Sequence, residues 1–179
     1  RGVDLVGKTA IVTGGASNLG HETVRVLTSR GAHVIVPARS ADAARQVLSG
    51  IPRVEIVPMD LLDPASVRRF ADKFLAGSKS LDLLILSAGV MATPLFRDAE
   101  GHEGQFATNH LGHFRLTAAL WPALRAASDA RVVVLSSRGH QLGGLDLDDL
   151  DFTRRPYDKW LAYGQAKTAN ALFIVALDA

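Results

Sequence analysis

The sequence predicts a three-layer α/β fold in which helices cover both faces of one doubly wound parallel sheet. Short β-rich apolar runs alternate along the chain with segments of helical period, and the runs are apolar on both faces. Strands of that kind are buried from both sides, as in a parallel sheet whose connections are helices. The expected strands are residues 8–14, 32–39, 53–60, 81–89 and 131–137.

The segments between these runs have helical period and recognisable ends. Gly31 follows the first of them, and Asp63-Pro64 supplies an N-cap followed by proline at the first helical position. The expected helices are residues 18–31, 41–50, 64–77 and a long stretch from about 104 to 127.

Length and composition favour a single domain over residues 1–179. The chain is long enough for one core, and 47% hydrophobic residues with 21% charged residues is ordinary for a globular protein. The net charge of +2 comes from scattered residues, so we expect neither a nucleic-acid partner nor an anionic membrane partner. With no cysteine, no visible signal peptide and no apolar stretch of membrane-spanning length, we expect a cytoplasmic protein without a membrane span.

No metal site is predicted. The six histidines are scattered, the chain contains no H-E-x-x-H motif, and thiolate ligands are absent. In "HLGH", residues 110–113, we expect at least one histidine to face neighbouring structure.

The first expected strand runs into the glycine-rich turn "TGGASNLG", residues 13–20, and then directly into a helix. Glycines let the backbone approach a ligand, and the unpaired N–H groups of a helix start point at an anion. The turn therefore predicts a site for the pyrophosphate of a dinucleotide. The alternative is a tight turn between strand and helix that binds nothing.

Four further motifs follow in order: "MDLLD" (59–63), "SAG" (87–89), "FATNHLGHF" (106–114), and "VVVLSS" (132–137) with "YGQAK" (163–167). Each is weak alone, because a tyrosine and a lysine at i and i+4 share a face of any helix. An isolated Asn109 would be a core asparagine that bends a helix, and an isolated Ser136-Ser137 would be a turn that ends a strand. Their order and their places at strand ends make the set specific.

Together these motifs resemble the short-chain dehydrogenase/reductase superfamily, and within it the retinol-dehydrogenase-like and WW-domain-oxidoreductase-like members. The resemblance covers nearly the whole chain. It implies a Rossmann-type fold and an oxidoreductase that interconverts an alcohol and a ketone or aldehyde. Because the family also includes regulatory members, a protein that binds a dinucleotide without turnover is the alternative.

By this resemblance the catalytic residues are Asn109, Ser137, Tyr163 and Lys167. Tyr163 would act as general acid or base, helped by the charge of Lys167 one helical turn further on. Ser137 would orient the substrate oxygen, and Asn109 would hold a water that relays the proton. Neighbouring strand residues face opposite ways, so only one of Ser136 and Ser137 can point at the substrate, and the family alignment favours Ser137.

The cofactor site follows from the same resemblance. Asn18 stands where a glycine is usual, and asparagine tolerates the left-handed conformation; Ser87 replaces the usual asparagine. Arg39 after the second strand favours the 2′-phosphate of NADP(H), with NAD(H) and a solvated Arg39 as the alternative. The predicted cofactor-binding residues are Gly14, Ser17, Asn18, Leu19, Gly20, Arg39, Asp60, Leu61, Ser87, Ala88, Gly89, Tyr163 and Lys167.

The remaining expectations concern partners and the end of the chain. The resemblance implies an apolar small-molecule carbonyl or alcohol as substrate, and a homodimer or homotetramer formed through the helices from Gly104 and Pro156. The family's C-terminal strands are absent, so we expect a truncated domain in which residues 131–137 form an edge strand. The acidic stretch within 138–155 is expected to be a solvated loop, with a role in covering the active site as the alternative.

Overall fold

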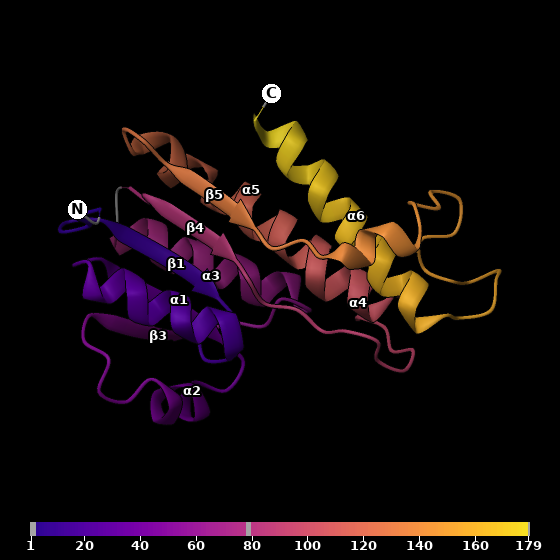
Figure 1. Ribbon diagram of the computed structural model, residues 1–179, viewed down its shortest axis with the longest axis horizontal. Helices are drawn as coiled ribbons and strands as arrows, with labels where there is room; N and C mark the ends of the chain where they lie inside the picture. Colours follow the sequence, from indigo (N-terminus) through magenta and orange to yellow (C-terminus); the bar gives the residue numbers. More distant parts are fainter. Residues whose placement is uncertain (1–2, 78–79, 179) are drawn as a thin grey trace.

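A computed structural model describes residues 3–77 and 80–178. The described residues form one five-stranded parallel sheet of order β3-β2-β1-β4-β5 (Figure 1). The strands are β1 (Thr9–Thr13), β2 (His33–Ala38), β3 (Val54–Pro58), β4 (Leu83–Leu86) and β5 (Arg131–Val134). The helices are α1 (Asn18–Ser29), α2 (Ala41–Val47), α3 (Pro64–Gly77), α4 (Gly104–Phe106), α5 (Gly112–Ala126) and α6 (Lys159–Asp178), with a π-helical turn η1 (Ala107–Leu111) and a 3₁₀ turn η2 (Arg138–Leu142).

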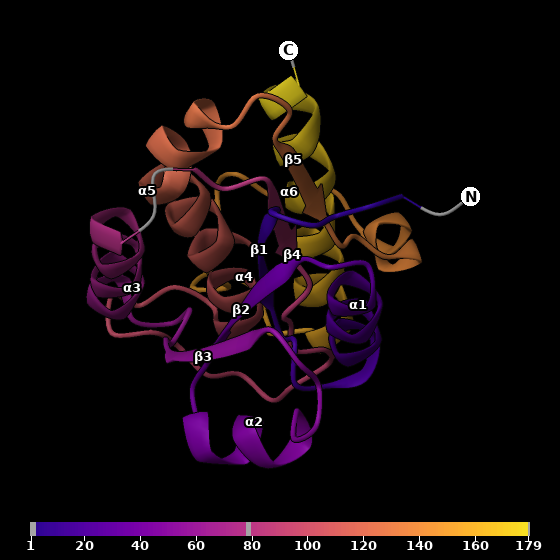
Figure 2. The ribbon, with the colours of Figure 1, turned by 90° about the vertical axis from the view of Figure 1, so that its left-hand side faces the viewer.

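Neighbouring residues of the central strands face opposite layers of helices. Ile11 of β1 packs in one cluster with buried residues of α3 and α5, such as Phe70 and Leu116. Ala10 and Val12 pack in a second cluster on the other face, with residues of α1. Figure 2 shows α3 and α5 on one side of the sheet and α1 on the other. Helices thus bury both faces of the central strands. This burial is the physical reason why both faces are apolar, which is the pattern that predicts the fold.

The predicted fold class is confirmed, and each expected strand and helix is present within a few residues of its expected bounds. Asp63 caps α3 as predicted, because its Oδ1 accepts a hydrogen bond from Ala65 N at 2.8 Å. The last expected helix differs, since the turn η1 interrupts it between α4 and α5. Within residues 3–77 and 80–178, no helix is both long and apolar enough to cross a bilayer.

The strand order reverses at β1. The chain proceeds from β1 outward to β3 and then returns to place β4 on the other side of β1. The connections after β1 and β4 consequently leave in different directions and open a crevice at the carboxyl ends of these strands. Pro37 lies in this region, beyond Ile35, which is the last residue of β2 paired with β1, so its missing N–H removes no bond of that ladder.

Among the described residues β5 forms one edge of the sheet, as predicted for residues 131–137. It pairs with β4 alone, and Val133 is 45% exposed. Edge strands usually carry charged residues or are covered, so an apolar edge strand such as β5 is uncommon.

The prediction of a solvated loop in the acidic stretch before α6 is wrong for its centre. Phe152 is only 5% exposed and Asp149 is 8% exposed. The Asp149 carboxylate accepts hydrogen bonds from the main-chain N–H groups of Thr153, Arg154 and Arg155. Burial acts to raise the pKa of Asp149, but these bonds outweigh burial and lower the pKa to about 2.

The same loop is fastened to α6. The buried Gln165 donates from Nε2 to Leu150 O at 2.8 Å and accepts at Oε1 from Asp146 N at 3.2 Å. The Arg155 guanidinium lies 4.0 Å from the centre of the Phe152 ring. The acidic residues of this loop thus accept hydrogen bonds within a folded turn. Composition alone does not distinguish such acceptors from charged residues that face solvent.

Candidate active site

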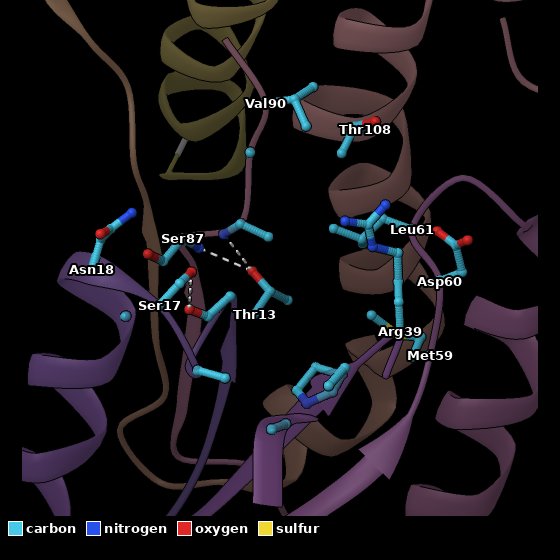
Figure 3. Close-up of a pocket in the computed structure, with 18 of the residues that line it drawn as sticks. Thr13, Ser17, Asn18, Arg39, Met59, Asp60, Leu61, Ser87, Val90 and Thr108 are labelled. Carbon is cyan, nitrogen blue, oxygen red and sulfur yellow. Dashed lines mark hydrogen bonds between the residues drawn. The ribbon is translucent and has the colours of Figure 1, made fainter. Parts of the chain in front are cut away.

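A cavity of about 760 Å³ opens at the carboxyl ends of β1, β2 and β4 (Figure 3). All the predicted cofactor-binding residues that precede α6 lie on its wall: Gly14, Ser17, Asn18, Leu19, Gly20, Arg39, Asp60, Leu61, Ser87, Ala88 and Gly89. They come from segments far apart in the sequence, and the common edge of the parallel strands brings them together. Figure 3 shows Ser17 and Asn18 on one side of the cavity, with Arg39 and Asp60 on the other.

The turn after β1 lies against the end of β4 and needs glycine at two positions. Gly14 has φ 68°, and a Cβ there would lie 2.9 Å from the Ala88 Cα. A Cβ on Gly20 would lie 2.2 Å from the main-chain oxygen of Gly14. Only bare backbone fits this close packing of turn, helix and sheet.

The start of α1 is free to face an anion. Its N-cap residue, Ser17, makes no side-chain hydrogen bond to the first helical turn, and that turn contains no acidic residue. The next residue, Asn18, has φ 45°, the left-handed conformation expected where it replaces glycine. The cavity wall here fits a pyrophosphate group, because open N–H groups and small residues adjoin it.

The opposite end of the cavity is formed by the residues after β2 and β3. Arg39 is exposed, and within the described parts of the chain its guanidinium forms no ion pair with a carboxylate. Ala43, Ala44 and Val47 of α2 also line this end, and none of them has a predicted role. Ala43 and Ala44 are small residues in the first turn of the helix that follows "PARS", whereas Val47 is its last residue.

Tyr163 and Lys167 share a face of α6 beside the cavity. The Lys167 Nζ lies 5.8 Å from the centre of the Tyr163 ring and donates a 2.8 Å hydrogen bond to Leu135 O. Leu135 is itself on the cavity wall, so the lysine lies directly behind that wall. Lys167 is 6% exposed, and burial lowers the pKa of its ammonium group.

The two serines after β5 face different neighbours. Ser136 Oγ donates to Lys167 O at 2.9 Å and is thus directed at the α6 backbone. Ser137 Oγ accepts from Gly139 N at 3.1 Å. A Cβ on Gly139 would lie 2.6 Å from Tyr163 Cε1 and 3.5 Å from Ser137 Oγ, so Ser137 and the Tyr163 ring flank the same glycine.

Asn109 lies in the π-helical turn and is fully buried. Its side chain accepts from Val90 N at 2.8 Å and donates to Val90 O at 2.9 Å. A Cβ on Gly89 would lie 3.0 Å from Asn109 Oδ1 and 3.9 Å from Lys167 Nζ. The structure therefore brings Asn109 and Lys167 together at Gly89, and Ser137 and Tyr163 together at Gly139. The Lys167–Tyr163 contact joins the two pairs, although none of the four residues is itself on the cavity wall.

Two buried residues without a predicted role connect these parts. Thr13 Oγ1 accepts from Ser87 N at 2.9 Å and from Ala88 N at 3.1 Å. It also lies 2.9 Å from His113 Nε2, while His113 Nδ1 lies 3.0 Å from Asn109 O. Burial lowers the pKa of His113 to about 4.

Gln105 connects the segment after β4 to the start of α6. Its Oε1 accepts from Ala92 N at 2.8 Å, and its Nε2 donates to Tyr157 Oη at 2.9 Å and to Lys159 O at 2.8 Å. Ala92 has φ 52°, a strained conformation for alanine that this bond helps to hold. A smaller hollow of about 310 Å³, lined by residues that include Thr93 and Trp160, lies beside this link.

A parallel sheet that opens a cavity where its strand order reverses is the arrangement by which doubly wound α/β proteins bind dinucleotides. This chain is a protein of that class. It belongs to the short-chain dehydrogenase family, whose model, described as "short chain dehydrogenase", matches residues 8–146.

Curated relatives agree with the predicted resemblance. The chain is 49% identical to a Streptomyces antibioticus protein named "Probable oxidoreductase", over 97% of this chain and 59% of that protein. It is 43% identical to retinol dehydrogenase 11 of Mus musculus, over 96% of this chain and 56% of that protein. The chain thus spans less than two thirds of the length of these relatives.

Solved structures show the same fold. An uncharacterised protein of Mycobacterium paratuberculosis matches with a TM-score of 0.89 and 42% identity, over 97% of this chain and 62% of that chain. The complex of RhlG from Pseudomonas aeruginosa with NADP matches with a TM-score of 0.75 and 26% identity, over 98% and 68%.

Replacing Gly20 with alanine is expected to lower the free energy of unfolding by about 2 kcal/mol or more, because the new methyl group would meet the Gly14 carbonyl oxygen. Gly144→Ala is the matched control, since a Cβ there meets nothing within 4 Å. Urea unfolding of both variants measures the difference. Equal stability of the two variants would contradict the close packing described here.

Stability is expected to fall as the pH drops below about 6.5, because unfolding lets His113 take up a proton that it resists in the fold. Its pKa rises from about 4 in the folded chain toward 6.5 in the unfolded chain. The unfolded state therefore binds more protons between these values, and the loss is about 2 kcal/mol at pH 5 relative to pH 8. Urea unfolding of wild type and His113→Gln at both pH values measures it. Titration of the other groups is common to both proteins, so an equal pH dependence would count against a buried neutral His113.

Proposed function

We propose that the whole protein is an NADP(H)-dependent oxidoreductase that interconverts an alcohol and a ketone or aldehyde, with Tyr163 as general acid or base. The observation that carries this proposal is the placement of the Lys167 ammonium 5.8 Å from the centre of the Tyr163 ring, behind the wall of the dinucleotide cavity. Proton transfer at a carbonyl oxygen needs a donor, and the reverse reaction needs a base.

A free phenol has a pKa near 10 and is a weak base at neutral pH. Lys167 brings a positive charge to 5.8 Å from the centre of the Tyr163 ring, on the same face of α6. Burial works against the charge of Lys167, and the Leu135 carbonyl opposes burial by accepting a hydrogen bond from the ammonium. Within the described residues the Tyr163 hydroxyl forms no hydrogen bond, which leaves it available to a substrate.

Ser137 and Asn109 have complementary tasks in this proposal. Since Ser137 Oγ accepts from Gly139 N, its own hydrogen remains available for a substrate oxygen. Both polar atoms of the Asn109 side chain are bonded to Val90, so a water held by Asn109 would bond to its main-chain carbonyl. The bound nicotinamide would supply or accept the hydride, while these residues orient the substrate and move the proton.

The preference for NADP(H) is supported by Arg39. Its guanidinium lies at the end of the cavity formed after β2, where the adenine ribose of a bound dinucleotide would lie, and a charge-assisted contact to a 2′-phosphate contributes about 1.5 to 3 kcal/mol. The similar RhlG structure contains NADP. Asp60 and Leu61 would lie beside the adenine.

The proposal extends to assembly and location. Phe114 of α5 is 49% exposed, and Leu172 and Val175 of α6 are 55% and 68% exposed. The Phe114 and Phe173 rings lie 5.5 Å apart, so the exposed apolar residues of α5 and α6 adjoin each other. This surface supports a homodimer or homotetramer, and the composition without cysteine supports a cytoplasmic location.

Replacing Arg39 with glutamine is expected to weaken NADPH binding about tenfold or more and to change NADH binding less than about twofold, because only NADPH carries the 2′-phosphate. Arg45→Gln is the matched control: Arg45 is an exposed arginine of α2 that already pairs with Asp42. Dissociation constants from titration calorimetry measure both effects. Equal affinities of the wild-type protein for NADPH and NADH would defeat the assignment.

Replacing Tyr163 with phenylalanine is expected to leave NADPH binding unchanged and to lower turnover by about 100-fold or more, since the ring remains and the proton donor is lost. The measurement is NADPH consumption by the intact protein with a panel of apolar ketones and aldehydes, together with an NADPH titration. Unchanged turnover in the variant would refute the assigned role. Binding without turnover in the wild type would favour a regulatory dinucleotide-binding protein.

A further inference from the structure

We infer that His113 is a positioning residue: as a neutral imidazole with its proton on Nδ1, it fixes the Asn109 peptide relative to the Ser87–Ala88 segment of the cavity wall. The inference deepens the proposed function and rests on it only where turnover is measured. His113 is 1% exposed, and neither the predicted catalytic set nor the predicted cofactor set contains it.

The hydrogen bonds of the Thr13 hydroxyl determine the direction of the first link. Both lone pairs of Oγ1 are used, because the N–H groups of Ser87 and Ala88 donate to them at 2.9 and 3.1 Å. The single hydroxyl hydrogen remains to be donated. Its candidate acceptors are His113 Nε2 at 2.9 Å and the Ile85 carbonyl at 3.5 Å, and the shorter contact is the effective hydrogen bond.

The second link follows from the first. If His113 Nε2 accepts from Thr13, the proton of the neutral ring is on Nδ1 and is donated to Asn109 O at 3.0 Å. The other neutral tautomer would direct an Nε2–H at a hydroxyl with no free lone pair and would place two acceptors, Nδ1 and the carbonyl oxygen, against each other. Only one protonation state satisfies both contacts.

The charges around the ring support this state. Burial is the largest cause that lowers the pKa of His113, and the nearby Lys167 and His110 lower it further. The hydrogen bond to the Asn109 carbonyl acts in the opposite direction. A cationic ring would also carry an Nε2–H with no acceptor in this network. The neutral form is therefore favoured by both desolvation and hydrogen bonding.

The link reaches groups that form the site. Asn109 is held at three points, by two bonds to the Val90 main chain and by the bond from His113. Ser87 and Ala88 are on the cavity wall, and Gly89, which follows them, lies close to both Asn109 Oδ1 and Lys167 Nζ. A shift of His113 would therefore move the cofactor-facing wall relative to the residues around Lys167, and misplacement on the scale of 1 Å can change a rate by about 100-fold.

The tautomer can be measured without any substrate. In the intact protein labelled with ¹⁵N-histidine, long-range proton–nitrogen spectra should show a protonated Nδ1 and an unprotonated, hydrogen-bonded Nε2 for His113 between pH 8 and 5.5. The signal is assigned by its loss in His113→Gln. A ring protonated at Nε2, or a cationic ring, at pH 7 would overturn the inference.

Substitutions of Thr13 test whether its hydroxyl donates the hydrogen bond that His113 Nε2 accepts. Thr13→Ser retains the hydroxyl and should leave both nitrogen signals in place. Thr13→Val keeps the shape and removes the hydroxyl, so Nε2 should lose the signature of an accepted hydrogen bond. If the Nε2 signal is the same in Thr13→Val as in wild type, Thr13 is not its donor and the inference fails.

Turnover tests the positioning role. In His113→Gln the amide replaces the ring and can no longer bridge both partners, so kcat should fall about tenfold or more while the dissociation constant of NADPH changes less than about threefold. Val34→Ala in β2 is the control for a general loss of stability, because Val34 is fully buried in the core cluster on the other face of the sheet. Equal kcat in His113→Gln and wild type, or an equal loss of kcat in Val34→Ala, would refute the role.

The two sets of measurements separate failure of this inference from failure of the proposed function. If the wild-type protein turns over no carbonyl compound, the proposed oxidoreductase fails, while the nitrogen spectra of wild type and the Thr13 variants still decide the tautomer and the link. If wild type turns over substrate and the spectra show the other tautomer, only the inference about His113 fails.

Discussion

The cavity depends on how β1 and β4 separate at their carboxyl ends. Their ladder ends at Thr13 paired with Leu86, and the next two amides, of Ser87 and Ala88, have left the strand. An unsatisfied buried amide costs about 1 to 3 kcal/mol. The Thr13 hydroxyl accepts from both, so the strands can part at this residue without that penalty. This one hydroxyl thus ties the first two residues of the 87–89 wall to the end of β1.

The Lys167 ammonium, which lies beside Tyr163, also depends on contacts with neighbouring segments. Lys167 is 6% exposed, and burying its ammonium group is costly; the hydrogen bond to the Leu135 carbonyl offsets part of that penalty. That carbonyl belongs to the segment that continues β5, while Ser136, the next residue, bonds back to the α6 main chain. The end of β5 and the middle of α6 therefore hold each other in register, and the lysine lies against Leu135 of the cavity wall.

Much of the fold and of the cavity could be predicted from sequence because both depend on local patterns. Apolar runs indicated the strands, and residues that follow parallel strands share one edge, which is why Gly14, Arg39, Asp60 and Ser87 meet there. The roles of His113 and Gln105 could not be predicted, since their partners are 100 and 13 residues away in the chain and no periodicity encodes a hydrogen bond. The folded acidic turn around Asp149 was mistaken for solvated charge, because composition does not show which carboxylates accept from the main chain.

The free side of β5 has a consequence for the behaviour of this chain in solution. Arg131–Val134 includes three consecutive valines, and among the described residues the outer side of this strand meets no other strand. An extended backbone with open hydrogen-bonding groups can accept a strand from any chain that collides with it. Resistance to aggregation would then depend on the segment or partner that covers β5. Aggregation would increase with protein concentration even where the free energy of unfolding is high.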